Sequence, residues 1–141
     1  MGQARATIAM ALLLIASPAL AAGNTAGFEM GGNYRRFDPV VSQYNQSGEM
    51  FRIDGHCQSS CTLFLSIRNV CVSRSATLLF HSAHDRNGNP SPSNTEHMLA
   101  AYNPQLREYL VSHHYMETLA FYAISGSDMI RKFGYRACPR K

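Results

Sequence analysis

The chain has 141 residues with 13 basic and 9 acidic side chains, which gives a formal net charge of +4 at pH 7. This length predicts one domain. The basic residues are scattered, without a basic stripe interleaved with aromatic residues, and this distribution argues against a nucleic-acid-binding protein.

The N-terminus has the pattern of an export signal. Residues 8–15 are aliphatic, Arg5 precedes them, and Ala19 and Ala21 supply the small residues of a cleavage site. The run is shorter than the ~20 residues that a bilayer-spanning helix needs, which argues against a membrane anchor. We expect a secretory signal peptide over residues 1–22 and a mature domain over residues 23–141, periplasmic or secreted and not membrane-anchored after cleavage.

Four cysteines follow the expected cleavage site: Cys57, Cys61, Cys71 and Cys138. An even number in an exported chain predicts two disulfides, with three pairings open. We favour Cys71 with Cys138, tying the C-terminal tail to the sheet, and Cys57 with Cys61 around a turn. A zinc site is the alternative, but the Cys57–Cys61 spacing is not that of a zinc knuckle and no matching Cys/His pair follows.

Apolar periodicity and turn residues predict an α/β domain with a mostly parallel sheet, flanking helices and a helical C-terminal part. In chain order we expect a strand at 28–30, a helix from about 38 to 44, strands at 50–53, 70–72 and 77–80 with a helix at 61–67 between the first two, and helices at 95–101, 104–113, 118–124 and 128–133. Residues 85–95 are rich in Gly, Pro and polar residues, and a loop of this length is typical of a lid or binding loop.

The turn between residues 55 and 61 carries the chemistry. Ser59 lies where a strand is expected to pass into a helix, so its side chain would stand at the carboxyl end of the sheet, where α/β folds bind ligands. The N–H of Ser60 would begin a helix and point at a developing negative charge. His81 ends a later strand and would emerge at the same edge, as a nucleophilic serine requires of its base. Two alternatives stay open: Ser60 is the nucleophile, or both serines only cap the helix.

The order Gly31-Gly32, Gly55-x-Cys57-x-Ser59-Ser60-Cys61-Thr62 and Leu79-Phe80-His81 resembles the Clp-type serine peptidases. The likeness is to exported bacterial relatives with a Cys-x-Ser-small-Cys turn, and it covers roughly residues 28–81. It implies a small, truncated Clp/crotonase-like domain. In that family the order is a Gly-Gly oxyanion loop, the serine, and then the histidine.

Carried onto this chain, the resemblance makes Ser59 the nucleophile and His81 the general base, with the N–H groups of Gly32 and Ser60 as the oxyanion hole. Asp128, in the C-terminal part, is the candidate third member, and Asp85 is a second candidate. The implied activity is an ATP-independent serine hydrolase acting on peptides or unfolded proteins. No ATPase partner and no cofactor are expected, and a homo-oligomer is compatible with the sequence.

Departures from the family leave two other functions open. The mature chain is short, and Cys61 stands where the family typically has glycine. A non-catalytic, disulfide-stapled interaction module on the same fold is therefore one alternative. A metal site formed by residues 81–85 together with His56 or with His113 and His114 is the other, although its ligand pattern is incomplete.

Overall fold

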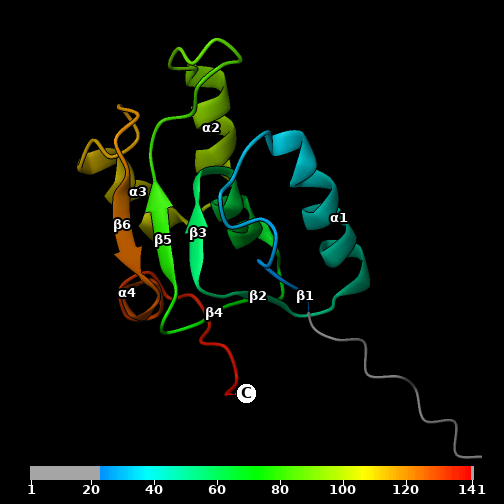
Figure 1. Ribbon diagram of the computed structural model, residues 1–141. Helices are drawn as coiled ribbons and strands as arrows, with labels where there is room; N and C mark the ends of the chain where they lie inside the picture. Colours follow the sequence, from blue (N-terminus) through cyan, green and yellow to red (C-terminus); the bar gives the residue numbers. More distant parts are fainter. Residues whose placement is uncertain (1–22, 141) are drawn as a thin grey trace, which may run out of the picture.

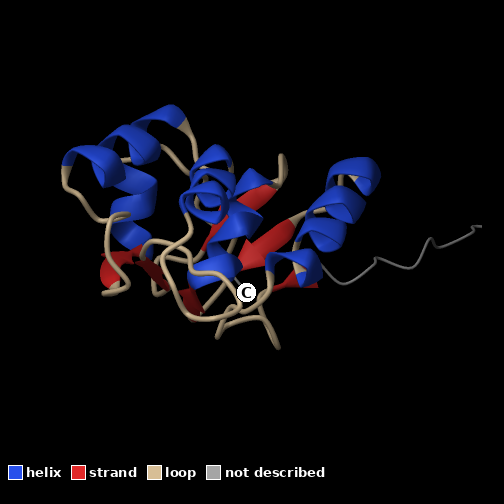
Figure 2. Ribbon diagram, turned by 90° about the horizontal axis from the view of Figure 1, so that it is seen from above, coloured by secondary structure: helices blue, strands red, loops and turns tan. Residues whose placement is uncertain are grey.

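The computed structural model of the protein describes residues 23–140. The predicted signal peptide, residues 1–22, lies outside the described residues. Strands and helices alternate through most of the chain, and Figure 2 shows the helices on either side of the strands. The predicted mixed α/β class is confirmed at this level.

The strands form two small sheets in place of the single sheet that we predicted. The first has the order β1-β2-β4, and all its strands are parallel: β1 (Gly23–Asn24), β2 (Phe51–Ile53) and β4 (Val70–Val72). The second has the order β3-β5-β6, with β3 parallel to β5 and β6 antiparallel to it: β3 (His56–Gln58), β5 (Thr77–Phe80) and β6 (Tyr122–Ser125). The chain crosses between the sheets at residues 54 and 55, so the serine turn belongs to the second sheet.

Helices connect and flank these strands (Figure 1): η1 (Tyr34–Arg36), α1 (Asp38–Ser47), η2 (Ser59–Ser66), α2 (Pro92–Ala100), α3 (Pro104–Ser112) and α4 (Gly126–Arg131). Their starts follow from the sequence. Proline in the first turn and an N-cap side chain set the beginnings of α2 and α3, where Ser91 accepts from the N–H of Asn94 and Asn103 accepts from the N–H of Leu106. The helix predicted at 61–67 is a 3₁₀ helix that begins two residues earlier, at Ser59.

Two predicted elements are wrong. Residues 28–30 form turns instead of a strand. Residues 118–124 are not a helix, because Tyr122 to Ser125 form β6, which pairs with the whole of β5. The last helix is capped by Ser125, whose Oγ accepts from the N–H of Asp128.

The hydrophobic core is centred on the aromatic ring of Phe64, which lies in η2. The rings of Phe28, Phe37 and Phe51 lie 5.2, 5.4 and 4.5 Å from it, in edge-on or tilted orientations that aromatic pairs favour. These rings come from the N-terminal segment, the start of α1 and β2. Because Phe64 sits five residues after the serine turn, the core anchors the helix that follows that turn.

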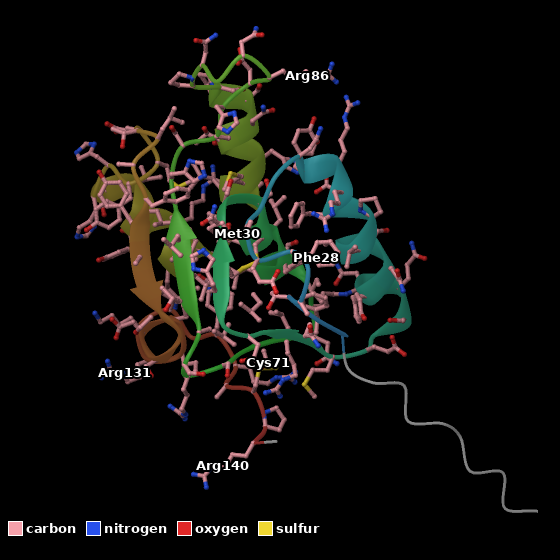
Figure 3. The ribbon with its side chains drawn as sticks, viewed as in Figure 1. Phe28, Met30, Cys71, Arg86, Arg131 and Arg140 are labelled. Atoms are coloured by element: carbon pink, nitrogen blue, oxygen red, sulfur yellow. A yellow bond between two sulfur atoms is a disulfide. The ribbon has the colours of Figure 1, made fainter. Side chains whose placement is uncertain are left out.

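Both disulfides have the pairing that we favoured. Cys57–Cys61 joins β3 to the first turn of η2 with a Cα–Cα distance of 5.2 Å, and Cys71–Cys138 joins β4 to the C-terminal tail with a Cα–Cα distance of 4.8 Å. Figure 3 shows Cys71 at the lower end of the molecule, where the tail returns. Within residues 23–140, no helix has the length and apolar character needed to cross a membrane.

Candidate functional site

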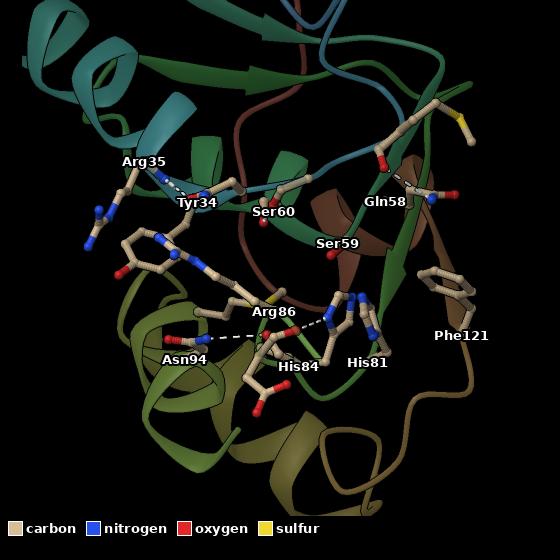
Figure 4. Close-up of a pocket in the computed structure, with 16 residues that line it drawn as sticks. Tyr34, Arg35, Gln58, Ser59, Ser60, His81, His84, Arg86, Asn94 and Phe121 are labelled. Carbon is tan, nitrogen blue, oxygen red and sulfur yellow. Dashed lines mark hydrogen bonds between the residues drawn. The ribbon is translucent and has the colours of Figure 1, made fainter. Parts of the chain in front are cut away.

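A pocket of about 480 Å³ opens where the serine turn faces the loop that follows β5. Ser59, Ser60 and His81 all line it, together with Met30 and residues 32–35. Figure 4 shows the Ser59 hydroxyl and the His81 ring facing the same space. The structure therefore brings together the serine turn, the histidine and the glycine loop, which are widely separated in the sequence.

Ser59 has a left-handed backbone, with φ at 53°. L-residues other than glycine rarely adopt this conformation, which costs of order 1–3 kcal/mol and persists only where the surroundings impose it. Here a disulfide and a hydrogen bond hold the backbone of Ser59 in this conformation. The Cys57–Cys61 disulfide spans the turn, and the Oγ of Thr62 donates to the carbonyl oxygen of Ser59 at 2.7 Å. The hydroxyl of Tyr102 in turn lies 2.6 Å from that Thr62 oxygen, inside the core.

The two serines have different environments. Ser60 is buried, and its Oγ donates to the carbonyl oxygen of Gly32 at 2.5 Å. Ser59 is half-buried, and its Oγ makes no hydrogen bond within the described part of the chain. This difference favours Ser59 over Ser60 as the residue that faces a ligand.

The glycine pair packs directly against the serine turn. A Cβ atom on Gly31 would lie 2.7 Å from the carbonyl oxygen of Gln58 and 2.8 Å from the Cβ of Ser59, and the φ of Gly31 is +70°. Two further bonds hold this loop in place: the Gln58 N–H donates to the Glu29 carbonyl at 2.9 Å, and the Gln58 side chain donates to the Met30 carbonyl at 3.2 Å. Only glycine permits so close an approach.

Two backbone N–H groups are available beside Ser59. The N–H of Ser60 lies in the first turn of η2, where helical N–H groups have no partner within the helix. The N–H of Gly32 donates to no group among residues 23–140. These are the two groups that we predicted for an oxyanion hole, and both residues line the pocket.

His81 directly follows β5 and is only 4% exposed, yet neither of its ring nitrogens has a hydrogen-bond partner within residues 23–140. Its ring lies 4.6 Å from that of Phe121. Burial lowers the pKa of His81, and the charge of neighbouring His84 lowers it further. The imidazole is therefore neutral at pH 7, the state in which it can accept a proton.

No hydrogen bond joins Ser59 to His81 in the structure, since both ring nitrogens are unpartnered. For the same reason, no carboxylate among residues 23–140 orients the imidazole. The site thus holds a serine and a histidine in one pocket without a completed hydrogen-bonded chain.

The structure does not bring Asp128 to His81. In the β5–β6 pair, Ser125 lies opposite Thr77 at the start of β5, whereas His81 follows the other end of that strand. Asp128 therefore stands at the far end of the sheet, next to Arg131 (labelled in Figure 3). Hydrogen bonds from Lys132 and Arg131 lower the pKa of the Asp128 carboxyl. An acidic residue in the first turn of a helix also interacts favourably with the helix dipole, which accounts for Asp128 without a catalytic role.

Asp85 lines the pocket, but its carboxylate serves the loop. One carboxylate oxygen accepts from the N–H groups of Asn87 and Asn89 at 2.8 and 3.0 Å, and these bonds lower the pKa of Asp85. The ring of His84 contacts the Asp85 carbonyl oxygen at 2.8 Å, not the carboxylate. Asp85 thus shapes the loop without orienting His81.

The histidines do not assemble a metal centre in the described part of the chain, where no three His, Cys, Asp or Glu side chains converge. His56 pairs with the side chain of Gln58 at 2.8 Å, and His114 pairs with Glu117 at 2.7 Å. All four cysteines are in disulfides, so none is free to bind zinc.

Several pocket residues were not predicted from the sequence. Arg35 and Arg86 line the pocket from η1 and from the loop after β5, and Met30 and Phe121 line it with exposed apolar side chains. The length of the 85–95 loop pointed to a binding role for that segment in general terms. Nothing in the sequence indicated Phe121, because residues 118–124 were expected to form a helix.

Comparison with protein-family models, with curated proteins and with solved structures finds no match. The geometry of the pocket is therefore the basis for assigning a function.

Proposed function

We propose that the protein is an exported serine hydrolase, a peptidase with a Ser59–His81 pair. The observation that carries this proposal is the left-handed Ser59 at a strand-to-helix turn, with its hydroxyl facing a pocket shared with a buried, unpartnered His81. Strained serines at such turns present their hydroxyl outward and place the following N–H beside it. The order of glycine pair, serine and histidine, with its resemblance to Clp-type peptidases, supports the same assignment.

The proposed reaction has two steps. The Ser59 Oγ attacks the substrate carbonyl while His81 accepts its proton, and the oxyanion that forms receives hydrogen bonds from the N–H groups of Gly32 and Ser60. The bond to the leaving group breaks, and His81 returns the proton to it. Water then hydrolyses the acyl-serine ester by the reverse roles, which restores the serine and releases a carboxylic acid.

Two features set the expected rate. Ser59 and His81 must approach to hydrogen-bond distance when substrate binds, as catalytic groups often do. Without a carboxylate to orient the imidazole, turnover will be slow, because that carboxylate contributes a factor of about 10⁴ in complete triads.

Short or unfolded peptides are the substrates that such an unassisted enzyme would cleave. The two disulfides fit an oxidising, extracytoplasmic compartment.

Labelling with a fluorophosphonate, which reacts only with activated serines, tests this function. We expect the oxidised wild-type protein over residues 23–141 to be labelled, and Ser59→Ala and His81→Ala to lose the label. Ser75→Ala, which removes an exposed serine outside the pocket, is the matched control. Labelling lost in Ser60→Ala but kept in Ser59→Ala would move the nucleophile by one residue.

A non-catalytic interaction module is the second candidate. It is favoured by the missing hydrogen bond between Ser59 and His81 and by the lack of an orienting carboxylate in the described chain. Wild-type protein that stays unlabelled across pH 6 to 9 would support this module and rule out the hydrolase.

A further inference from the structure

Two arginines in the wall of the Ser59 pocket have no charged partner in the described part of the chain. Arg35 belongs to η1 and Arg86 to the loop after β5, and Figure 4 shows both side chains on the side of Ser59 away from Phe121. Both are exposed, and neither guanidinium makes a hydrogen bond or an ion pair with any group among residues 23–140. Two cations are thus presented to whatever enters the pocket.

Most other arginines in the described chain are engaged elsewhere. Arg107 pairs with Glu96 at 2.5 Å, Arg131 pairs with Asp128 at 2.6 Å, and Arg52 donates to the Pro139 carbonyl at 3.1 Å. The acidic side chain that lines the pocket, Asp85, has its carboxylate occupied by backbone N–H groups of its own loop. The wall therefore carries two arginine cations against the single Asp85 carboxylate, and the charge of the pocket remains positive.

The pocket has two chemically different sides. Figure 4 shows Arg35 and Tyr34 on one side of Ser59, and Gln58 and Phe121 on the other. The Phe121 side is apolar, since Phe121 is 48% exposed, and Met30, whose carbonyl is bonded to Gln58, is 69% exposed. A ligand that spans Ser59 thus meets cations at one end and apolar surface at the other.

We propose that this pocket selects substrates that carry a carboxylate on one side of the bond to be cleaved and an apolar group on the other. This specificity rests on the proposed hydrolase function. Arginine is suited to the role because its planar guanidinium binds a carboxylate through two parallel hydrogen bonds. The carboxylate can come from the C-terminus of a peptide or from a Glu or Asp side chain.

Binding to the inactive Ser59→Ala protein tests the specificity without turnover. One pair of ligands is acetyl-Ala-Phe-Ala with a free or an amidated C-terminus, and the other is acetyl-Phe-Ala-Glu-amide against its Gln counterpart. We expect the carboxylate member of at least one pair to bind about tenfold more tightly by calorimetry, the effect of one charged hydrogen bond. The pair that shows the preference identifies the source of the carboxylate.

Arginine variants in the same background locate the preference. Arg35→Gln and Arg86→Gln should each reduce it, and the double variant should abolish it. Arg74→Gln removes the same charge from an exposed arginine outside the pocket and should leave it unchanged, with circular dichroism as the check on folding. Added salt should weaken the preference, because these cations are exposed.

Equal affinity within both ligand pairs, or a preference that survives the double variant, would overturn the proposed specificity. Such a result would leave the hydrolase standing if wild-type protein is labelled by fluorophosphonate. Unlabelled wild type with an arginine-dependent carboxylate preference would instead refute hydrolysis and leave a carboxylate-binding pocket.

Discussion

Ser59 combines backbone strain with an accessible hydroxyl, and these two properties predict opposite effects of one substitution. Glycine adopts a φ near 53° without the penalty that serine incurs, while all the backbone hydrogen bonds of the turn remain. We expect Ser59→Gly to raise the free energy of unfolding by about 1 kcal/mol and to abolish fluorophosphonate labelling. Urea denaturation alongside labelling checks both effects.

Ser60→Ala is the contrasting variant at the next residue. It removes the 2.5 Å hydrogen bond from the buried Ser60 hydroxyl to the Gly32 carbonyl, so the free energy of unfolding should fall by about 1 kcal/mol. A Ser59→Gly protein less stable than wild type would show that the left-handed turn is not strained.

The protonation of His81 predicts the pH dependence of labelling. The imidazole accepts a proton only when neutral, and burial lowers its pKa below the ordinary value of 6.5. Labelling should therefore be lost as pH falls through a midpoint below 6.5. A rate profile between pH 4 and 8 gives that midpoint, and a midpoint above the ordinary value would contradict the neutral buried imidazole.

The same lowered pKa affects stability. Between the folded-state pKa of His81 and the unfolded value near 6.5, the unfolded chain binds more protons than the folded one, so stability rises with pH across that window. His81→Phe, which cannot be protonated, should remove this contribution from the difference in urea midpoint between pH 5 and pH 7.

At the scale of elements, the contact between the glycine loop and the serine turn leaves no space for a side chain on Gly31. Gly31→Ala imposes a φ of +70° on alanine and drives a Cβ against the Gln58 carbonyl and the Ser59 Cβ. We expect this variant to lose labelling and at least about 2 kcal/mol of stability, because both strain and overlap act.

Gly48→Ala separates these two causes. Gly48 has a φ of +72°, but no atom of residues 23–140 lies within 4 Å of an added Cβ, so this variant carries the backbone strain without the overlap. It should lose about 1 kcal/mol and keep full labelling. Equal labelling in the two alanine variants would show that the loop does not position the serine.

Local signals in the sequence predicted many elements well. The proline and N-cap of α3, the alternation before Ile53 and the apolar β5 all act within a few residues, so their elements appear where expected. Residues 122–125 differ, because their strand exists only through pairing with β5, more than 40 residues earlier in sequence. Tertiary pairing of this kind overrides a short local pattern.

The features of the candidate site also fall into those set by local sequence and those set by tertiary packing. Ser59 and His81 were predicted because each follows a local strand, whereas the glycine pair was predicted from the order of the motifs and follows turns instead of a strand. The left-handed φ of Ser59 and the position of Arg35 depend on how separate segments pack, which the sequence does not show. Asp128 lies away from His81 because the antiparallel direction of β6 carries α4 to the opposite end of β5.

At the scale of the whole molecule, the two disulfides constrain loops of different length. Cys71–Cys138 has a sequence separation of 67 residues and Cys57–Cys61 one of 4. Loop entropy predicts losses of about 4 and about 2 kcal/mol when the respective pairs are replaced by alanine. Chemical denaturation of the two double variants measures this order.

Labelling should respond in the opposite order. Cys57→Ala/Cys61→Ala releases the turn that holds Ser59 and should abolish labelling, whereas Cys71→Ala/Cys138→Ala acts far from the pocket and should preserve it wherever the protein is folded. Loss of labelling in folded Cys71→Ala/Cys138→Ala protein would contradict a local role for the first disulfide.

The C-terminal tail pairs with β4, an edge strand of the first sheet. Val72 donates to the Arg136 carbonyl at 2.8 Å, and Cys138 donates to the Val72 carbonyl at 3.0 Å, so the tail covers the outer edge of β4. An uncovered strand edge is a template on which another chain can pair. The Cys71–Cys138 disulfide thus limits self-association by holding the tail over this edge. Where a reductant releases the tail, the apolar Val-Cys-Val edge of β4 is open to pairing with a neighbouring molecule. Aggregation then competes with refolding.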